Sequence, residues 1–328
     1  MAVLVVGGAG YIGSVTARAL HRAGRDVVVL DDLSTGSRQA VPDGVTFVQG
    51  STHDPGLVER VVMEGGIDVA VHFAAKKSVA ESMVQPGRYF AENVGGTNSL
   101  LDALVGAGVR RVVFSSSAAV YGNPVSLPIL EDDAKSPESP YGESKLIVEQ
   151  MLRWYDRCHG LASVSLRYFN AAGAADDGSL GEDFAHSTNL VPVLMKAVLG
   201  RRPPLEVFGT DYPTRDGTCV RDYVHVEDLA DAHVRAVEYL ERGGATNAVN
   251  LGTSKGSTVM EVISSAEAVV RRPVPWIAAP RRPGDPVDLY AGILRAREVL
   301  GWEPARGLAE IMQSEWLWRQ FRPDGFAG

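Results

Sequence analysis

Residues 3–13 read Val-Leu-Val-Val-Gly-Gly-Ala-Gly-Tyr-Ile-Gly, an apolar run that ends in a cluster of glycines. The run predicts a buried strand at 3–7, and the amphipathic stretch 12–23 predicts a helix after it. Glycines between a strand and a helix let the backbone turn sharply and approach phosphate oxygens, while the helix offers free N–H groups. The stretch therefore indicates a dinucleotide-binding turn. Its expected contact residues are Gly7, Gly10, Tyr11, Ile12 and Gly13.

An acidic residue follows the second predicted strand, 26–30. Asp31 stands about 20 residues beyond the glycines, where a carboxylate can accept hydrogen bonds from the adenosine ribose hydroxyls. The same carboxylate would repel a 2′-phosphate, so NAD is favoured over NADP. Taken alone, Asp31-Asp32 is equally a solvated cap at the end of a strand, but its register with the glycines favours NAD binding.

Short β-branched runs alternate with amphipathic stretches through the first half of the chain. Further strands are predicted at 46–49, 69–73, 112–115 and 163–167, and further helices at 56–64, 89–107 and 141–159. Such alternation implies parallel strands joined by crossover helices. The expected fold is therefore α/β, with a Rossmann-type doubly wound parallel sheet.

The pattern changes after about residue 170, where Gly and Pro become frequent and strand candidates become short. We expect an NAD-binding Rossmann domain over 1–170 and a smaller mixed α/β domain over 171–328. The second domain would close over the first and bind the substrate. A late segment, 248–252, could return to the first domain's sheet.

Composition excludes several classes of protein. Apolar residues make up 45% and charged residues 22% of 328, values of an ordinary globular protein, and the net charge of −8 disfavours nucleic acid or an anionic membrane as partner. No apolar stretch approaches the ~20 residues needed to cross a bilayer. Two cysteines, Cys158 and Cys219, are too few for a disulfide framework and, with no signal sequence evident, indicate the cytoplasm.

Two side chains in Ser139-Pro140-Tyr141-Gly142-Glu143-Ser144-Lys145 suit proton transfer at a carbinol. Pro140 is a typical helix-start residue, so Tyr141 and Lys145 are expected on one face of a helix, a turn apart. A nearby ammonium stabilises phenolate and lowers a tyrosine pKa from about 10 towards neutrality. Tyr141 is therefore the expected general base or acid, although this spacing also occurs by chance on many helices.

Three serines, Ser115-Ser116-Ser117, end the apolar strand upstream of this helix. Their hydroxyls are expected at the carboxyl edge of the sheet, where ligands bind in such folds. Ser117 could bond a substrate hydroxyl and relay its proton to Tyr141. By itself the segment is equally a polar turn at the end of a strand. The glycine turn, Asp31, the serine hydroxyl and the Tyr-x-x-x-Lys pair follow one another in this order, and together they are a strong signal.

With these motifs the sequence resembles the extended short-chain dehydrogenase/reductase family and, within it, the UDP-glucose 4-epimerases. The resemblance covers nearly the whole chain, and its late blocks are the more specific ones. The similar segments are 7–14, 72–75, 93–97, 115–122, 141–145, 167–171, 208–212, 216–226 and 280–285.

The resemblance implies a reaction as well as a fold. UDP-glucose and UDP-galactose would be interconverted by transient oxidation at carbon 4 of the sugar, with tightly bound NAD. Tyr141 would remove the 4-hydroxyl proton with help from Ser117. The keto sugar would rotate about its diphosphate link and take hydride back on the opposite face, so there is no net oxidation.

Site residues follow from the resemblance, position by position. The cofactor would also be contacted by Asp32, Thr35, Gly36, Ser51, Thr52, Phe73, Ala74, Ala75, Lys77, Asn93, Ser115 and Phe169, together with Tyr141 and Lys145. The UDP-sugar would be held by Lys77, Ser117, Tyr141, Asn170, Asn189, Leu190, Val207, Phe208, Arg221, Tyr223, Arg282, Asp285 and Leu289. Arg221 and Arg282, both expected in Gly/Pro-rich loops, suit the diphosphate because guanidinium forks match phosphate oxygens. No metal is expected.

Four positions depart from the family pattern. Ser51 stands where an aspartate commonly touches adenine, Ala119 replaces a frequent threonine beside the sugar, and Cys219 falls where glycine is usual. Leu289 occupies a position that limits pocket size, where a bulky tyrosine restricts some relatives to plain hexoses. Because leucine is smaller, N-acetylated sugars could also fit.

The same residues discriminate between competing functions. A nucleotide-sugar 4,6-dehydratase needs an acid and a base after the catalytic hydroxyl, where this chain has Ala118 and Ala119. A uronate decarboxylase is disfavoured for a similar reason. A 4-epimerase of UDP-N-acetylhexosamine or UDP-uronate remains open. A non-catalytic NAD-binding regulator would not need both Tyr141 and Lys145, and a purely structural protein fits less well still.

The helices predicted at 89–107 and 141–159 carry enough apolar surface to pair across a two-fold axis. Relatives commonly dimerise through equivalent helices. A homodimer is therefore expected.

Overall fold

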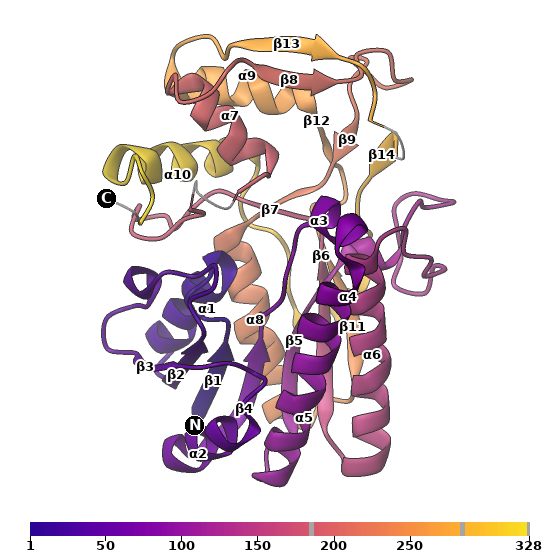
Figure 1. Cartoon of the computed structure of the whole chain (residues 1–328). Helices are drawn as coiled ribbons and strands as arrows, with labels where there is room; N and C mark the ends of the chain where they lie inside the picture. Colours follow the sequence, from indigo (N-terminus) through magenta and orange to yellow (C-terminus); the bar gives the residue numbers. More distant parts are fainter. Residues whose placement is uncertain (184–186, 283–285, 327–328) are drawn as a thin grey trace.

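A computed structural model describes residues 1–183, 187–282 and 286–326. Figure 1 shows a larger lobe, in which a sheet lies between helices, and a smaller lobe above it that holds α7, α9 and the β8–β13 ribbon. In these residues no helix combines the length and the apolar character that crossing a bilayer demands.

The larger lobe is built on a seven-stranded parallel sheet in the order β11-β6-β5-β4-β1-β2-β3. The strand order reverses between β1 and β4, and in doubly wound sheets ligands bind at the carboxyl ends of the strands beside such a reversal. The segment near 248–252 does return to this sheet, as the edge strand β11. The strands are β1 (Ala2–Val6), β2 (Asp26–Asp31), β3 (Thr46–Gln49), β4 (Ile67–His72), β5 (Arg111–Ser117), β6 (Ala162–Tyr168) and β11 (Asn247–Leu251).

Helices cover both faces of the sheet, which is why β1 is apolar without interruption. Val3 and Val5 face a core shared with α1 and α8, whereas Leu4 and Val6 face a second core under α2, α5 and α6. These helices are α1 (Tyr11–Arg22), α2 (Pro55–Gly65), α5 (Gly96–Gly106), α6 (Pro140–His159) and α8 (Val226–Glu241).

The single helix predicted at 89–107 is wrong in detail. The segment is α4 (Pro86–Tyr89), a π-helical turn at Phe90–Gly95 and then α5. The wide turn presents Asn93 inward. Its side-chain amide accepts from the N–H of Lys76 (2.7 Å) and donates to the carbonyl oxygen of Lys76 (3.0 Å). π turns of this kind occur mostly at functional sites. A short helix, α3 (Val79–Val84), precedes α4.

The smaller lobe has more regular structure than its Gly/Pro content predicts. Val191, Leu194, Val262 and Ile311 belong to its own core. Its helices are α7 (Leu190–Val198), α9 (Val259–Val270) and α10 (Leu308–Phe321). Its strand pairs are β8 (Leu205–Phe208) with β13 (Trp276–Ala279), and β7 (Asn170–Ala172) with β10 (Tyr223–His225). β9 (Val220–Arg221) lies between β12 (Ser257–Thr258) and β14 (Asp288–Leu289). Single turns occur at Arg38–Ala40, Ala118–Val120 and Ala296–Leu300.

Candidate active site

A pocket lies over the carboxyl ends of β1, β2, β4 and β5, and the glycine turn forms its floor. Gly7 has a φ of +81°, and a Cβ there would lie 2.6 Å from the backbone nitrogen of Ala74. A Cβ on Gly13 would lie 2.3 Å from the carbonyl oxygen of Gly7. Neither position admits a side chain. The turn leads into α1, whose first turn carries no acidic residue and no side-chain cap, so its amides are suited to an anion.

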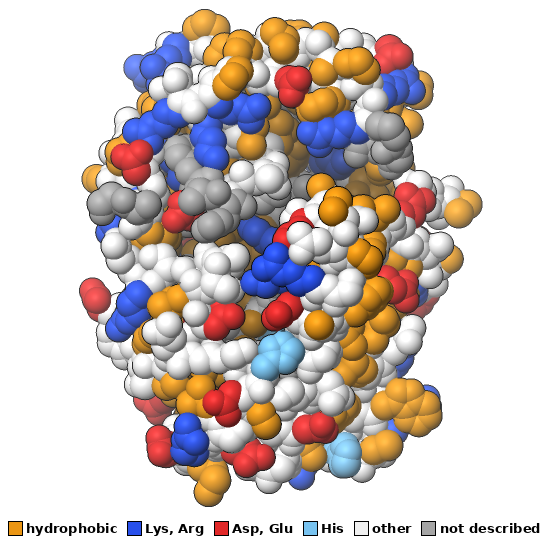
Figure 2. Space-filling view, in the orientation of Figure 1, with side chains coloured by type: hydrophobic (Ala, Val, Ile, Leu, Met, Phe, Trp, Pro, Cys, Tyr) orange, Lys and Arg blue, Asp and Glu red, His pale blue; other side chains and the backbone are white. Residues whose placement is uncertain are grey.

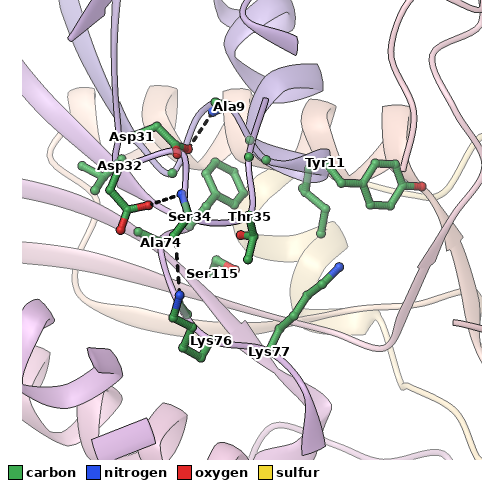
Figure 3. A pocket seen from close by; sticks show the side chains of 18 of the residues that line it. Ala9, Tyr11, Asp31, Asp32, Ser34, Thr35, Ala74, Lys76, Lys77 and Ser115 are labelled. Carbon is green, nitrogen blue, oxygen red and sulfur yellow. Dashed lines mark hydrogen bonds between the residues drawn. The ribbon is translucent and has the colours of Figure 1, made fainter. Parts of the chain in front are cut away.

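Asp31 is buried at the end of β2 and holds the glycine turn in place. Its carboxylate accepts hydrogen bonds from the N–H of Ala9 (2.9 Å) and of Leu33 (2.8 Å). Burial raises the pKa of Asp31, and these two bonds oppose that rise. The adjacent Asp32 accepts from the N–H of Ser34 at 2.8 Å (Figure 3). The two carboxylates therefore order the loop that would surround an adenosine ribose.

Ser117, Tyr141 and Lys145 meet where β5 ends and α6 begins. Ser139 caps α6 by accepting from the N–H of Gly142 (3.1 Å), and Pro140 is the first helical residue, as predicted. Ser117, the last residue of β5, is hydrogen-bonded to the Tyr141 side chain. The ammonium of Lys145 donates to the carbonyl of Ser115 at 2.8 Å and lies 5.9 Å from the centroid of the Tyr141 ring.

The expected lowering of the Tyr141 pKa by Lys145 is not what the folded chain provides. Burial raises the pKa of Tyr141, and the hydrogen bond with Ser117 offsets only part of this rise. Burial also lowers the pKa of Lys145 to about 7, against the opposing charge of Glu149, so its own positive charge is weakened near neutral pH. A cationic ligand beside Tyr141 would supply the missing positive charge.

Most of the predicted cofactor residues line this one pocket. They are Gly7, Gly10, Tyr11, Ile12, Gly13, Asp31, Asp32, Thr35, Gly36, Ser51, Thr52, Phe73, Ala74, Ala75, Lys77, Ser115, Tyr141 and Lys145. Asn93 and Phe169 are not among the lining residues. Asn93 is buried and also donates to Ser144 of α6 (3.0 Å), so it ties the Lys76 loop to the catalytic helix. Phe169 packs beside Val120 and Tyr121.

The pocket also contains residues that the sequence did not single out. Tyr168 ends β6 and its hydroxyl is hydrogen-bonded to that of Ser115. Lys76 lines the pocket and donates to the hydroxyl of Ser34 at 3.2 Å (Figure 3). Glu182 reaches the pocket from the smaller lobe. Tyr168 could have been found from the sequence, because it stands between the predicted strand 163–167 and Phe169. Lys76 and Glu182 could not, because their places in the pocket depend on tertiary contacts.

The predicted substrate residues lie in the smaller lobe and at its junction with the sheet. Asn170 pairs in register with Tyr223, and Leu289 pairs with Arg221. Arg221 is thus in strand β9, where a loop was expected. Leu289 packs against the cluster of Val120, Tyr121 and Ile129, just beyond the catalytic end of β5.

Other predicted substrate residues surround α7 and β8. The guanidinium of Arg282 lies 3.8 Å from the centroid of the Phe208 ring. Asn189 directly precedes α7 and makes no side-chain capping bond, and Leu190 begins the helix, whereas the side chain of Val207 is buried in the core of this lobe. Asp285 lies outside the described residues.

Charge is unevenly distributed over the two lobes. Figure 2 shows Lys and Arg side chains gathered on the upper half of this face, over the smaller lobe, although the chain as a whole carries a net charge of −8. A local excess of cations on an acidic protein is what binding of a diphosphate ligand requires.

Comparisons with known proteins agree with this geometry. The model of the NAD dependent epimerase/dehydratase family matches residues 3–252. The chain is 46% identical to the UDP-glucose 4-epimerase of Lacticaseibacillus casei over 327 residues, 99% of each chain. It is similar to the crystal structure of UDP-glucose 4-epimerase from Brucella ovis in complex with NAD (TM-score 0.94, 47% identity, 95% of this chain and 96% of that one).

A third similar structure is UDP-glucose 4-epimerase from Bifidobacterium longum in complex with NAD+ and UDP. Its TM-score is 0.93 at 38% identity, and the match covers 99% of this chain and 100% of that one. The family match, the Rossmann-type sheet and the glycine turn lead to one conclusion: the chain belongs to the NAD dependent epimerase/dehydratase family.

Proposed function

We propose that this chain is an NAD-dependent 4-epimerase that interconverts UDP-glucose and UDP-galactose. The observation that carries the proposal is the half-buried Tyr141, hydrogen-bonded to Ser117 and adjacent to Lys145, in a pocket whose glycine turn fits a dinucleotide. Similarity over nearly the full length to UDP-glucose 4-epimerases supports the same reaction.

The residues of the pocket fit NAD. The glycine turn and the uncapped start of α1 would hold the diphosphate, and Asp31 and Asp32 would face the adenosine ribose. When bound there, NAD supplies a reversible hydride acceptor. A carboxylate beside the ribose opposes a 2′-phosphate, which is why NAD is proposed rather than NADP.

The chain itself supplies proton transfer and positioning. Tyr141 takes the proton of the 4-hydroxyl, which Ser117 orients, and returns a proton when the alcohol is re-formed. Lys145 fixes the end of β5 through the carbonyl of Ser115. Holding the sugar by its UDP portion alone leaves the hexose free to turn and present its other face, so the smaller lobe would anchor the nucleotide and diphosphate.

A direct assay tests the proposed reaction. Purified protein, incubated with UDP-galactose and no added NAD, is expected to form UDP-glucose and to release NAD on denaturation. UDP-N-acetylgalactosamine and UDP-glucuronate, assayed in parallel, measure the range of substrates. Protein that carries no nicotinamide, takes up none and leaves each UDP-sugar unchanged would refute the proposal.

A dehydratase is disfavoured by the geometry as well as by the sequence. Ala118 and Ala119 form the turn directly after Ser117. Neither side chain can act as the acid or base that elimination of water requires at that place.

Leu289 is expected to set the size of the sugar pocket. Its strand, β14, pairs with the Arg221 strand, and its side chain packs against the cluster of Val120, Tyr121 and Ile129 beyond the catalytic end of β5. In Leu289→Tyr the larger ring should reduce kcat/KM for UDP-N-acetylgalactosamine by about 10- to 100-fold, in the range expected when a group no longer fits an apolar pocket. UDP-galactose turnover should change little; an equal loss on both substrates would exclude this role.

We also propose that two chains associate through α5 and α6 and that the protein works in the cytoplasm. Trp154 on α6 is 61% exposed, and Phe90, Met83 and Val84 are exposed on the segment before α5, which favours a partner surface there. Cys158 and Cys219 are not joined in a disulfide, which suits a reducing compartment. The mass in solution, measured by sedimentation equilibrium, tests the dimer.

A further inference from the structure

A buried carboxylate joins the two lobes at the pocket. Glu182 lies before α7, and its side chain is only 4% exposed. Its Oε1 accepts from Nζ of Lys77 in the larger lobe at 2.9 Å, and the amide nitrogen of Asn189 lies 3.1 Å from each carboxylate oxygen. Glu182 therefore touches one residue expected at the cofactor and one expected at the UDP-sugar.

The backbone of Glu182 is fixed independently of its side chain. Its carbonyl oxygen accepts from Nη2 of Arg319 (2.7 Å) and from the indole nitrogen of Trp318 (3.3 Å), both on α10. The preceding Gly181 is packed so closely that a Cβ would lie 2.6 Å from the Trp318 ring. The carboxylate is thus presented to the pocket from a rigid support.

A carboxylate is an unexpected residue at this place. The pocket is proposed to hold a dinucleotide diphosphate, and the UDP-sugar brings a second one, so a buried negative charge is unfavourable unless it is paired. Lys77 provides that pairing. In return the carboxylate restrains Lys77, whose side chain is 56% exposed and would otherwise sample many rotamers. Burying the Glu182 carboxylate costs desolvation energy, and in exchange the carboxylate holds the donors of Lys77 and Asn189 in fixed positions.

We propose that Glu182 is a positioning residue that couples NAD retention to UDP-sugar binding, acting through Lys77 on the cofactor side and Asn189 on the substrate side. The inference rests on the proposed function. Because Lys77 and Asn189 share one carboxylate, binding of a ligand at the cofactor site also orders Asn189, and binding at the substrate site also orders Lys77. Coupling between two sites is reciprocal for equilibrium affinities, so UDP should tighten NAD by the same factor by which NAD tightens UDP, and slower release of NAD is the expected sign of that tightening.

The test uses the full-length protein loaded with NAD. The rate at which NAD passes into the ultrafiltrate is measured with and without UDP, for native protein, Glu182→Gln and Glu182→Leu. Native protein should release NAD more slowly with UDP present. Glu182→Leu removes every acceptor and should reduce the effect of UDP on NAD release by about tenfold, a typical size for coupling between sites. Glu182→Gln, which keeps one acceptor, should be intermediate.

Steady-state kinetics provide a second readout. In Glu182→Leu, KM for UDP-galactose should rise by about tenfold while kcat changes by less than about threefold. The lost restraint affects the binding of substrate and cofactor and leaves proton transfer by Tyr141 in place. The matched control is Glu227→Leu. Glu227 is a partly buried partner of Arg18, outside the pocket lining, and its replacement should leave the effect of UDP unchanged.

The outcomes separate this inference from the proposed function. If native protein binds neither NAD nor UDP, the proposed function fails. If it binds both, the inference is overturned when Glu182→Leu keeps the native response to UDP, or when Glu227→Leu loses that response equally. Should Glu182→Leu not fold, Glu182→Gln alone decides: a native response and a native KM would refute the role.

Discussion

Replacing Tyr141 with phenylalanine is expected to lower kcat for UDP-galactose by about 10³-fold, within the 10²–10⁴ range that positioned acid–base groups contribute. The hydroxyl is the only atom removed, and it is the group hydrogen-bonded to Ser117 at the end of β5. The ring remains, so the pocket keeps its shape. NAD content should stay close to native, since many other residues line the pocket.

Tyr155→Phe is the matched control for this experiment. Tyr155 lies on the same helix, and its hydroxyl donates to Asp102 at 2.5 Å, away from the pocket. It should retain native kcat, and both variants should be compared by initial rate and by the NAD released on denaturation. Epimerisation by Tyr141→Phe at near the native rate would show that another group moves the proton.

The parts of the fold that depend on local pattern could be predicted from the sequence. Six strands of the sheet were placed to within about two residues, because continuous apolar runs between amphipathic stretches have few alternatives in an α/β protein. The glycine turn and Asp31 were recognisable for the same reason: their roles depend on spacing along the chain. The C-terminal return of β11 to the sheet was raised only as a possibility.

The remaining features depend on distances in space. The π-helical turn at Phe90–Gly95 lies inside an amphipathic pattern that is typical of one continuous helix. Glu182 contacts Lys77 across 105 positions of sequence, so no local signal marks it. The sign of the Tyr141 pKa shift was predicted wrongly for a similar reason, because burial is a property of the folded chain, and it raises the pKa by more than the hydrogen bond with Ser117 lowers it. The division of the chain at 170/171 stays a prediction.

One buried ion pair joins α6, the helix that carries Tyr141 and Lys145, to the sheet. Arg167 on β6 donates to both carboxylate oxygens of Glu149 on α6 (2.9 and 2.6 Å), and Ser116 also donates to Glu149 (2.6 Å). Arg167 further donates to the hydroxyl of Tyr121 (2.8 Å) and to the carbonyl of Glu131 (3.0 Å). Both charged side chains are almost fully buried. The network therefore joins α6, β5, β6 and the segment that follows β5.

Arg167→Met is expected to lower the free energy of unfolding by about 3–5 kcal/mol, because it leaves the Glu149 carboxylate buried without its counter-charge. That is a large share of the about 5–15 kcal/mol that stabilises a typical domain. The urea midpoint, measured at saturating NAD and fixed protein concentration, reports the change. kcat should also fall, since Glu149 lies one helical turn after Lys145 and an unpaired carboxylate there would shift α6.

The double variant Glu149→Leu/Arg167→Met distinguishes the cost of an unpaired charge from the loss of a favourable contact. If the damage in Arg167→Met comes from the buried carboxylate, removing that carboxylate as well should recover most of the lost stability, because apolar replacements of buried pairs are often neutral. If instead the double variant is no more stable than Arg167→Met alone, the pair itself makes a net favourable contribution to the fold. In that case the precise placement of Tyr141 and Lys145 would depend on a net attraction between α6 and β6, and kcat would not recover with the double variant either.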